Sequence, residues 1–120
     1  MKENVIKEKS LQFAIRIVNL HKHIESQHNN YVLSKQILKS GTSIGANVRE
    51  ALGAQSKKDF CSKMNIALKE AYETEYWLEL LHKTDFLDDV AYQSMFTDCR
   101  ELTNLLASIV KTTKQDADLW

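Results

Sequence analysis

The chain has 120 residues, of which 43% are hydrophobic and 27% are charged, and it contains no proline. A chain of this length can bury one core, which predicts a single domain over residues 1–120. Its 16 Lys and Arg balance 16 Asp and Glu, so it does not resemble a uniformly basic nucleic-acid binder. No run of 18 apolar residues occurs and no apolar run follows a basic start. We therefore expect no membrane contact and a cytoplasmic location.

The charges are distributed unevenly along the chain. Residues 1–58 carry ten Lys and Arg against four Asp and Glu, and residues 59–120 carry six against twelve, which gives +6 and −6. Such a division favours head-to-tail contact between copies, or one basic and one acidic surface. The two cysteines, Cys61 and Cys99, have no CxxC partner and no histidine at metal spacing. We interpret both as small core or boundary residues.

Apolar residues recur at helical spacing in four segments, which predicts an all-α fold, an antiparallel up-down-up-down four-helix bundle. The expected helices cover about residues 4–27, 31–54, 57–83 and 88–111. The first has a broad apolar face in two stripes, Leu11, Ala14, Ile15 and Val18, and Ile6, Phe13, Ile17, Leu20 and Ile24. A turn at His28, Asn29 and Asn30 follows, and its asparagines could cap the second helix.

Ser56, followed three residues later by Asp59, is a start signal for the third helix. That helix has the strongest periodicity in the chain, with steps of four and three through Phe60, Met64, Ala67, Ala71, Thr74, Leu78 and Leu81. Aspartates near residue 88 suit the positive N-terminal end of a fourth helix. We expect the polar tail from about Thr112 to fray.

Two of the three glycines, Gly41 and Gly45, lie four residues apart inside the helix over 31–54. A glycine within a helix costs about 0.5 to 1 kcal/mol relative to alanine. Close approach of a neighbouring helix would offset that cost. The alternative is a solvated polar face with incidental glycines.

A polar stripe lies beside these glycines and carries Ser43, Asn47 and Glu50, while the helix over 57–83 carries Glu70 and Glu73 on one stripe with Ile66 and Trp77. An unpaired buried carboxylate is costly, so partial burial would require donors such as Asn47, Arg16 or Arg49. We predict a structural polar cluster formed by Ser43, Asn47, Glu50, Glu70 and Glu73 rather than a catalytic one.

Three stretches of the chain carry a resemblance: TSIGANVREA over 42–51, SKKDF over 56–60 and ALKEAYETE over 67–75. In these stretches the sequence resembles a four-helix-bundle family first noticed as the product of intervening sequences in bacterial 23S ribosomal RNA genes. The family-like residues are Ser43, Ile44, Asn47, Val48 and Glu50, with Ser56, Phe60, Ala67 and Glu73 in support. The chain departs from the family where members often have proline, at Gly45, and glycine, at Ala51.

The resemblance implies a non-enzymatic homopentamer whose molecular role is unassigned. A related branch of similar proteins serves as accessory protein to the reverse transcriptase of diversity-generating retroelements and contacts nucleic acid. We therefore expect the chain to form a homo-oligomeric ring. The alternative is that it is a nucleic-acid-binding accessory factor or a partner of a nucleic-acid-processing protein. This chain lacks the strong net positive charge of that branch.

Catalytic and metal-binding patterns are weak in this sequence. Two Glu-x-x-His sequences occur, Glu25 to His28 and Glu79 to His82. Di-iron helical bundles use this spacing to bind their metal ions. The start of the second helix offers no inward carboxylate, so we expect no metal and no cofactor. No Ser-His-Asp set, phosphate-binding glycine loop or zinc spacing occurs. We expect no enzymatic activity and no small-molecule substrate.

A basic surface is the candidate nucleic-acid contact. It comprises Lys35, Lys39, Arg49, Lys57 and Lys58. Repeated around a ring, these cations could bind phosphate backbones without reading bases. The alternatives are an ordinary solvated face, or the positive half of a subunit contact with Glu75, Glu79, Asp98 and Glu101.

Overall fold

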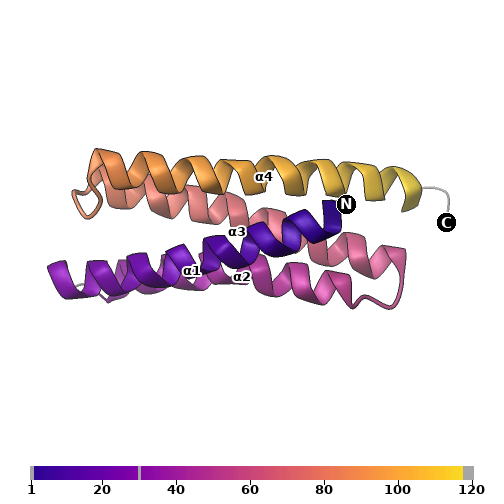
Figure 1. Cartoon of the computed structure of the whole chain (residues 1–120), viewed down its shortest axis with the longest axis horizontal. Helices are drawn as coiled ribbons and strands as arrows, with labels where there is room; N and C mark the ends of the chain where they lie inside the picture. Colours follow the sequence, from indigo (N-terminus) through magenta and orange to yellow (C-terminus); the bar gives the residue numbers. More distant parts are fainter. Residues whose placement is uncertain (1, 30, 118–120) are drawn as a thin grey trace.

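The computed structural model describes residues 2–29 and 31–117, and it consists of four helices in this part of the chain. They are α1 (Lys2–His28), α2 (Val32–Leu52), α3 (Lys57–Lys83) and α4 (Asp89–Ala117). Successive helices run antiparallel in a rod of 50 × 21 × 21 Å (Figure 1). Each helix packs on the next, and α1 closes against α4 through the least extensive contact. The predicted all-α four-helix bundle is confirmed.

Local sequence signals account for the ends of α3 and α4. The Ser56 hydroxyl accepts a hydrogen bond of 3.0 Å from the Asp59 amide, which caps α3 as predicted. Asp88 caps α4 by accepting from the Ala91 amide at 2.7 Å. The fourth helix, expected to end near residue 111, continues to Ala117. Residues 112–117 are mostly polar but include no glycine or proline, so the helix can continue through them. Residues 118–120 lie outside the described part.

The turn between α1 and α2 differs from the predicted capping. Asn29 has a φ of 50°, a left-handed conformation that asparagine tolerates, and its amide donates to the Glu25 carbonyl at 3.0 Å. It therefore ends α1 instead of capping α2. Tyr31 precedes α2 and makes no side-chain cap bond. Asn30 lies outside the described residues.

The core contains one buried stripe from each helix. From α3 it takes Met64, Ala67, Ala71, Thr74, Leu78 and Leu81, all fully buried, as their spacing indicates. In α1 the buried stripe is Ile6, Phe13, Ile17, Leu20 and Ile24. The second apolar stripe of α1 lies outside the core, with Leu11 41% and Ile15 48% exposed. Only one of the two apolar stripes predicted for α1 is thus buried in the bundle.

Helices α1 and α2 approach closely at the two helical glycines. A Cβ atom added to Gly41 would lie 2.7 Å from Ile17 Cγ1, and one added to Gly45 would lie 3.4 Å from the Ser10 carbonyl oxygen. The fully buried Ile17 side chain occupies the space that an alanine methyl at position 41 would need. The cost of glycine in α2 is therefore offset by packing on α1.

Candidate functional surfaces

The serine and asparagine of the predicted polar cluster form hydrogen bonds within their own helix. The Ser43 hydroxyl donates to the Lys39 carbonyl at 2.6 Å, and Asn47 Nδ2 donates to the Ser43 carbonyl at 2.8 Å. Neither of these two bonds crosses to a neighbouring helix, so they do not join α2 to α3. A short polar side chain in a helix readily reaches the carbonyl four residues earlier, which competes with partners on another helix.

The three carboxylates of that cluster lie on the outer edge between α2 and α3. Glu50 pairs with Lys63 at 3.3 Å, which joins α2 to α3. Glu73 accepts a hydrogen bond of 3.0 Å from Trp77 Nε1 on its own helix. Burial and the nearby Glu73 carboxylate raise the pKa of Glu70, against the opposing effect of Lys39. We call this surface the α2–α3 edge and define it as Ser43, Asn47, Glu50, Ile66, Glu70, Glu73 and Trp77.

The arginines proposed as donors to the cluster lie elsewhere. Arg16 extends to α4, where Nη1 is 2.5 Å from Asp98 Oδ2 and Nη2 donates to Ser94 Oγ at 2.8 Å. Arg49 lines a groove between α1 and α2. The described bonds do not join the five cluster residues into one network.

Sequence reasoning missed a buried hydroxyl pair between α2 and α3. The Thr74 hydroxyl donates to Ser40 Oγ at 3.0 Å, and both residues are fully buried. Ser40 belongs to the polar stripe of α2 and Thr74 to the apolar seam of α3. Thr74 is a polar residue at a seam position where apolar residues recur, and this was the signal that could have identified the contact.

Another missed group lies between α3 and α4 around Glu75. This carboxylate accepts a hydrogen bond from Thr103 Oγ1 at 2.5 Å and pairs with Arg100 at 3.1 Å. The adjacent Cys99 is fully buried, and burial raises the pKa of its thiol to about 12. Cys61 is also a buried free thiol. Both cysteines thus occupy the core positions that we predicted for them.

The histidines of the two Glu-x-x-His sequences have other contacts. His28 packs edge-on against Phe86, with ring centroids 4.9 Å apart. His82 Nε2 lies 2.6 Å from Asp89 Oδ1, and its ring stacks on Tyr92 at 4.2 Å. Within residues 2–29 and 31–117, no three His, Cys, Asp or Glu side chains are grouped in a way that could hold a metal ion.

The exposed stripe of α1 continues onto α2 to form one surface. Between the helices lies a groove of about 250 Å³, lined by Lys7, Ser10, Leu11, Ala14, Thr42, Gly45, Ala46 and Arg49. At helical spacing the surface extends to Ile15, Val18 and Lys22 on α1 and to Lys35 and Leu38 on α2. We call the whole set the α1–α2 face. Its centre is apolar and its charged margin includes Lys7, Lys22, Lys35 and Arg49.

The five basic residues proposed to contact nucleic acid are all exposed. These residues are Lys35, Lys39, Arg49, Lys57 and Lys58. None of them forms an ion pair with a carboxylate in the described part of the chain. Three of the four acidic residues suggested as their partners across a subunit contact are already paired, namely Glu75 with Arg100, Asp98 with Arg16 and Glu101 with Lys9.

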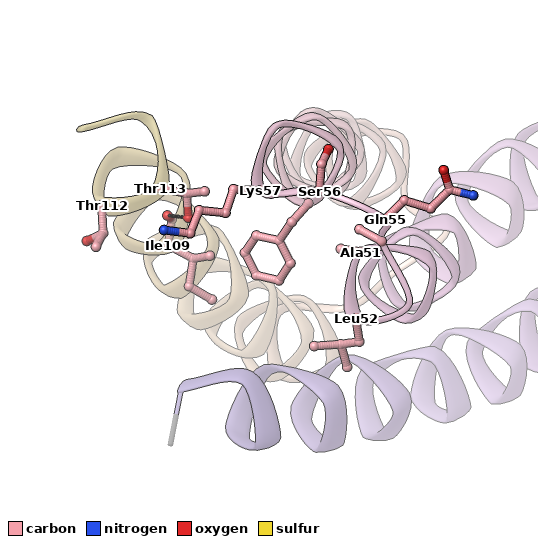
Figure 2. A pocket seen from close by; sticks show the side chains of 10 residues that line it. Ala51, Leu52, Gln55, Ser56, Lys57, Ile109, Thr112 and Thr113 are labelled. Carbon is pink, nitrogen blue, oxygen red and sulfur yellow. Dashed lines mark hydrogen bonds between the residues drawn. The ribbon is translucent and has the colours of Figure 1, made fainter. Parts of the chain in front are cut away.

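A larger cavity of about 610 Å³ opens at the end of the bundle that holds the α2–α3 turn. Figure 2 shows Ala51 and Leu52 of α2, Lys57 of α3 and Ile109 of α4 around it. The full lining is Ala51, Leu52, Ala54, Gln55, Ser56, Lys57, Phe60, Ile109, Thr112 and Thr113. Lys57 is the one ionisable side chain in this lining, so the cavity supplies no acid–base pair.

The fold places the chain in the class of small antiparallel helical bundles. The family model for the 23S rRNA-intervening sequence protein matches residues 2–108. The chain therefore belongs to this family.

A similar solved structure is that of a protein of unknown function from the S23 ribosomal protein family of Bacteroides thetaiotaomicron VPI-5482. It is 58% identical, the match covers 92% of this chain and 99% of that one, and the TM-score is 0.91. No curated protein matches significantly. Among the described residues, no helix is both long and apolar enough to cross a membrane.

Proposed function

We propose that the chain is a non-enzymatic bundle that assembles with copies of itself into a closed ring. The observation that carries this proposal is the exposed apolar stripe of α1. Leu11 and Ile15 are 41% and 48% exposed, and Ala14 and Val18 beside them are half-buried. A contiguous apolar surface of this kind is stabilised when a second protein surface removes it from water.

The size of the ring follows from the family resemblance, which implies five subunits. Five chains of 13.8 kDa have a mass of about 69 kDa. Size-exclusion chromatography with light scattering measures this mass directly. A single species of 13.8 kDa at micromolar concentration would overturn self-assembly, and another multiple would correct the subunit number alone.

A non-catalytic role is supported by the contacts of the ionisable side chains. The Glu-x-x-His histidines contact Phe86 and Tyr92, and the cavity of about 610 Å³ has Lys57 as the one ionisable group in its described lining. General acid–base or metal-assisted chemistry would need several such groups converging on one cavity. Elemental analysis of the purified protein provides the test, and stoichiometric iron, manganese or zinc would contradict this part of the proposal.

Binding to nucleic acid is the second candidate, and the exposed basic residues favour it. Lys35, Lys39, Arg49, Lys57 and Lys58 have no ion-pair partner in the described part of the chain, so they are available to phosphate groups. The resemblance to the accessory proteins of diversity-generating retroelements points in the same direction. A titration with structured RNA at two salt concentrations tests it, because phosphate contacts weaken steeply as salt rises.

Two variants sharpen this test. Replacing both Lys57 and Lys58 by Gln should weaken binding and reduce its salt dependence. Replacing Lys69 by Gln removes one exposed cation from α3 outside the proposed surface, so affinity should stay unchanged. Absence of binding by the wild-type chain at low salt would reject this second function.

A further inference from the structure

The α1–α2 face has a charge that disfavours its pairing with an identical face. The basic side chains Lys7, Lys22, Lys35 and Arg49 are exposed around its apolar centre. None of these four forms an ion pair in the described part of the chain. Two acidic residues border this side of α1: Glu25 pairs with His21 at 2.9 Å, and Glu8 accepts a hydrogen bond from Gln12 at 3.0 Å. Two copies joined symmetrically through this face would bring like charges together, which is unfavourable at an interface.

The α2–α3 edge has the complementary character. Glu70 and Glu73 form no ion pair in the described part of the chain, and the pKa of Glu70 is raised by burial and by its neighbour. Ile66 lies one turn before Glu70 and is 38% exposed, and Trp77 follows Glu73 on the same stripe. Two carboxylates therefore lie between apolar side chains, and Lys39 offsets only part of the charge of Glu70. A cationic surface with an apolar centre would neutralise the carboxylates and cover the isoleucine.

We propose that the α1–α2 face of one copy binds the α2–α3 edge of the next copy. The exposed Leu11 and Ile15 pack against Ile66, and the basic margin of the face neutralises Glu70 and Glu73. This inference rests on the proposed self-assembly and specifies its contact. A contact between two different surfaces is head-to-tail, so it generates either a closed ring or an open filament.

The placement of the two surfaces favours a ring. Helix α2 borders both of them, because it contributes Thr42 and Ala46 to one and Ser43 and Asn47 to the other. The two surfaces therefore adjoin along α2 and do not lie on opposite sides of the bundle. Neighbouring subunits are then related by a large rotation, which closes after a few copies.

The test uses one variant for each surface. Ile15→Glu damages the α1–α2 face and leaves the α2–α3 edge intact, and Ile66→Glu does the reverse. Both side chains are exposed enough, 48% and 38%, for the bundle to keep its fold, which circular dichroism and thermal melting will verify. Tyr72→Glu is the matched control, because Tyr72 is 50% exposed on α3 and shares a stripe with Glu75, which contacts α4.

We expect each of the two variants alone to be a monomer of 13.8 kDa, and Tyr72→Glu to keep the wild-type mass. Mixing the two variants should give a dimer of about 27.6 kDa, twice 13.8 kDa, and nothing larger, because each pair of copies retains one undamaged contact.

The outcomes separate this inference from the proposed self-assembly. A wild-type oligomer that Ile66→Glu leaves intact would overturn the inference while self-assembly stands. Two monomeric variants that fail to combine would also overturn it. A monomeric wild-type chain would overturn both proposals.

Discussion

Thr74 of α3 and Ser40 of α2 share a hydrogen bond of 3.0 Å at a point where both residues are fully buried. Ser40 in turn donates to the Ile37 carbonyl at 3.4 Å. The Thr74 hydroxyl also reaches the Glu70 carbonyl at 2.8 Å, so each buried hydroxyl has an acceptor in its own helix besides the bond between the two. It also fixes the register of the most extensive helix contact in the bundle, that between α2 and α3.

Replacing Thr74 by valine should destabilise the chain even though the substitution keeps its shape. The Ser40 hydroxyl would lose its cross-helix bond and keep the Ile37 carbonyl as its acceptor, so the cost should be that of one hydrogen bond, about 0.5 to 1.5 kcal/mol. Urea denaturation measures the free energy of unfolding. The double variant with Ser40→Ala should lose less than the sum of the single losses. Strictly additive losses would show that the two hydroxyls do not interact.

Gly41→Ala should destabilise the bundle in spite of alanine's higher helix propensity. The new methyl would lie 2.7 Å from Ile17 Cγ1, and relieving that overlap should cost about 1 to 3 kcal/mol. Gly53→Ala is the control, because the nearest atom to its added Cβ is 3.8 Å away and its φ is −98°. Thermal melting compares the two variants. Equal melting temperatures for both would contradict close packing of α1 on α2 at Gly41.

The sequence predicted the bundle well because periodic burial in a long helix is a local property. The seam from Met64 to Leu81 could be identified by its spacing alone. Spacing cannot decide which of two apolar stripes on α1 enters the core, since that depends on the position of α2 and α4. Leu11 and Ile15 therefore belong to the predicted apolar face of α1 but lie outside the core.

The bonding partners within the polar cluster could not be predicted, for a different physical reason. Stripe analysis places Ser43 and Asn47 toward a neighbouring helix, but each finds an acceptor one turn earlier in α2. Partner choice among polar side chains is set by distances within about an ångström, which sequence spacing does not give. The contact between Arg16 and Asp98 could not be predicted either. The two residues are 82 positions apart, and sequence spacing does not give the distance between their side chains.

The buried thiol of Cys99 should make stability depend on pH in alkaline solution. Its pKa is raised by burial from 9.0 to about 12, so the folded chain holds a proton that the unfolded chain releases. This contribution is complete below pH 9 and is lost as pH rises from 9 to 12, by up to about 1.4 kcal/mol per pH unit. Urea denaturation between pH 8 and about pH 10.5 measures it. Cys99→Ala should show a shallower decline than the wild type, and parallel curves would refute the effect.

Arg16 should hold α1 against α4, where the helix contact is least extensive. Its guanidinium contacts Asp98 and Ser94, and the side chains of the ion pair are 38% and 48% exposed. Arg16→Gln should therefore cost no more than about 1 kcal/mol. Its clearer effect should be faster hydrogen exchange in α1, measured by mass spectrometry. Lys69→Gln serves as the control, and equal exchange rates in the two variants would exclude this role for Arg16.

Sedimentation velocity of the unmodified chain at micromolar concentration shows whether copies assemble through the exposed stripe of α1. We expect one species near 69 kDa, five times the chain mass of 13.8 kDa. A boundary that sediments as a 13.8 kDa monomer would contradict it.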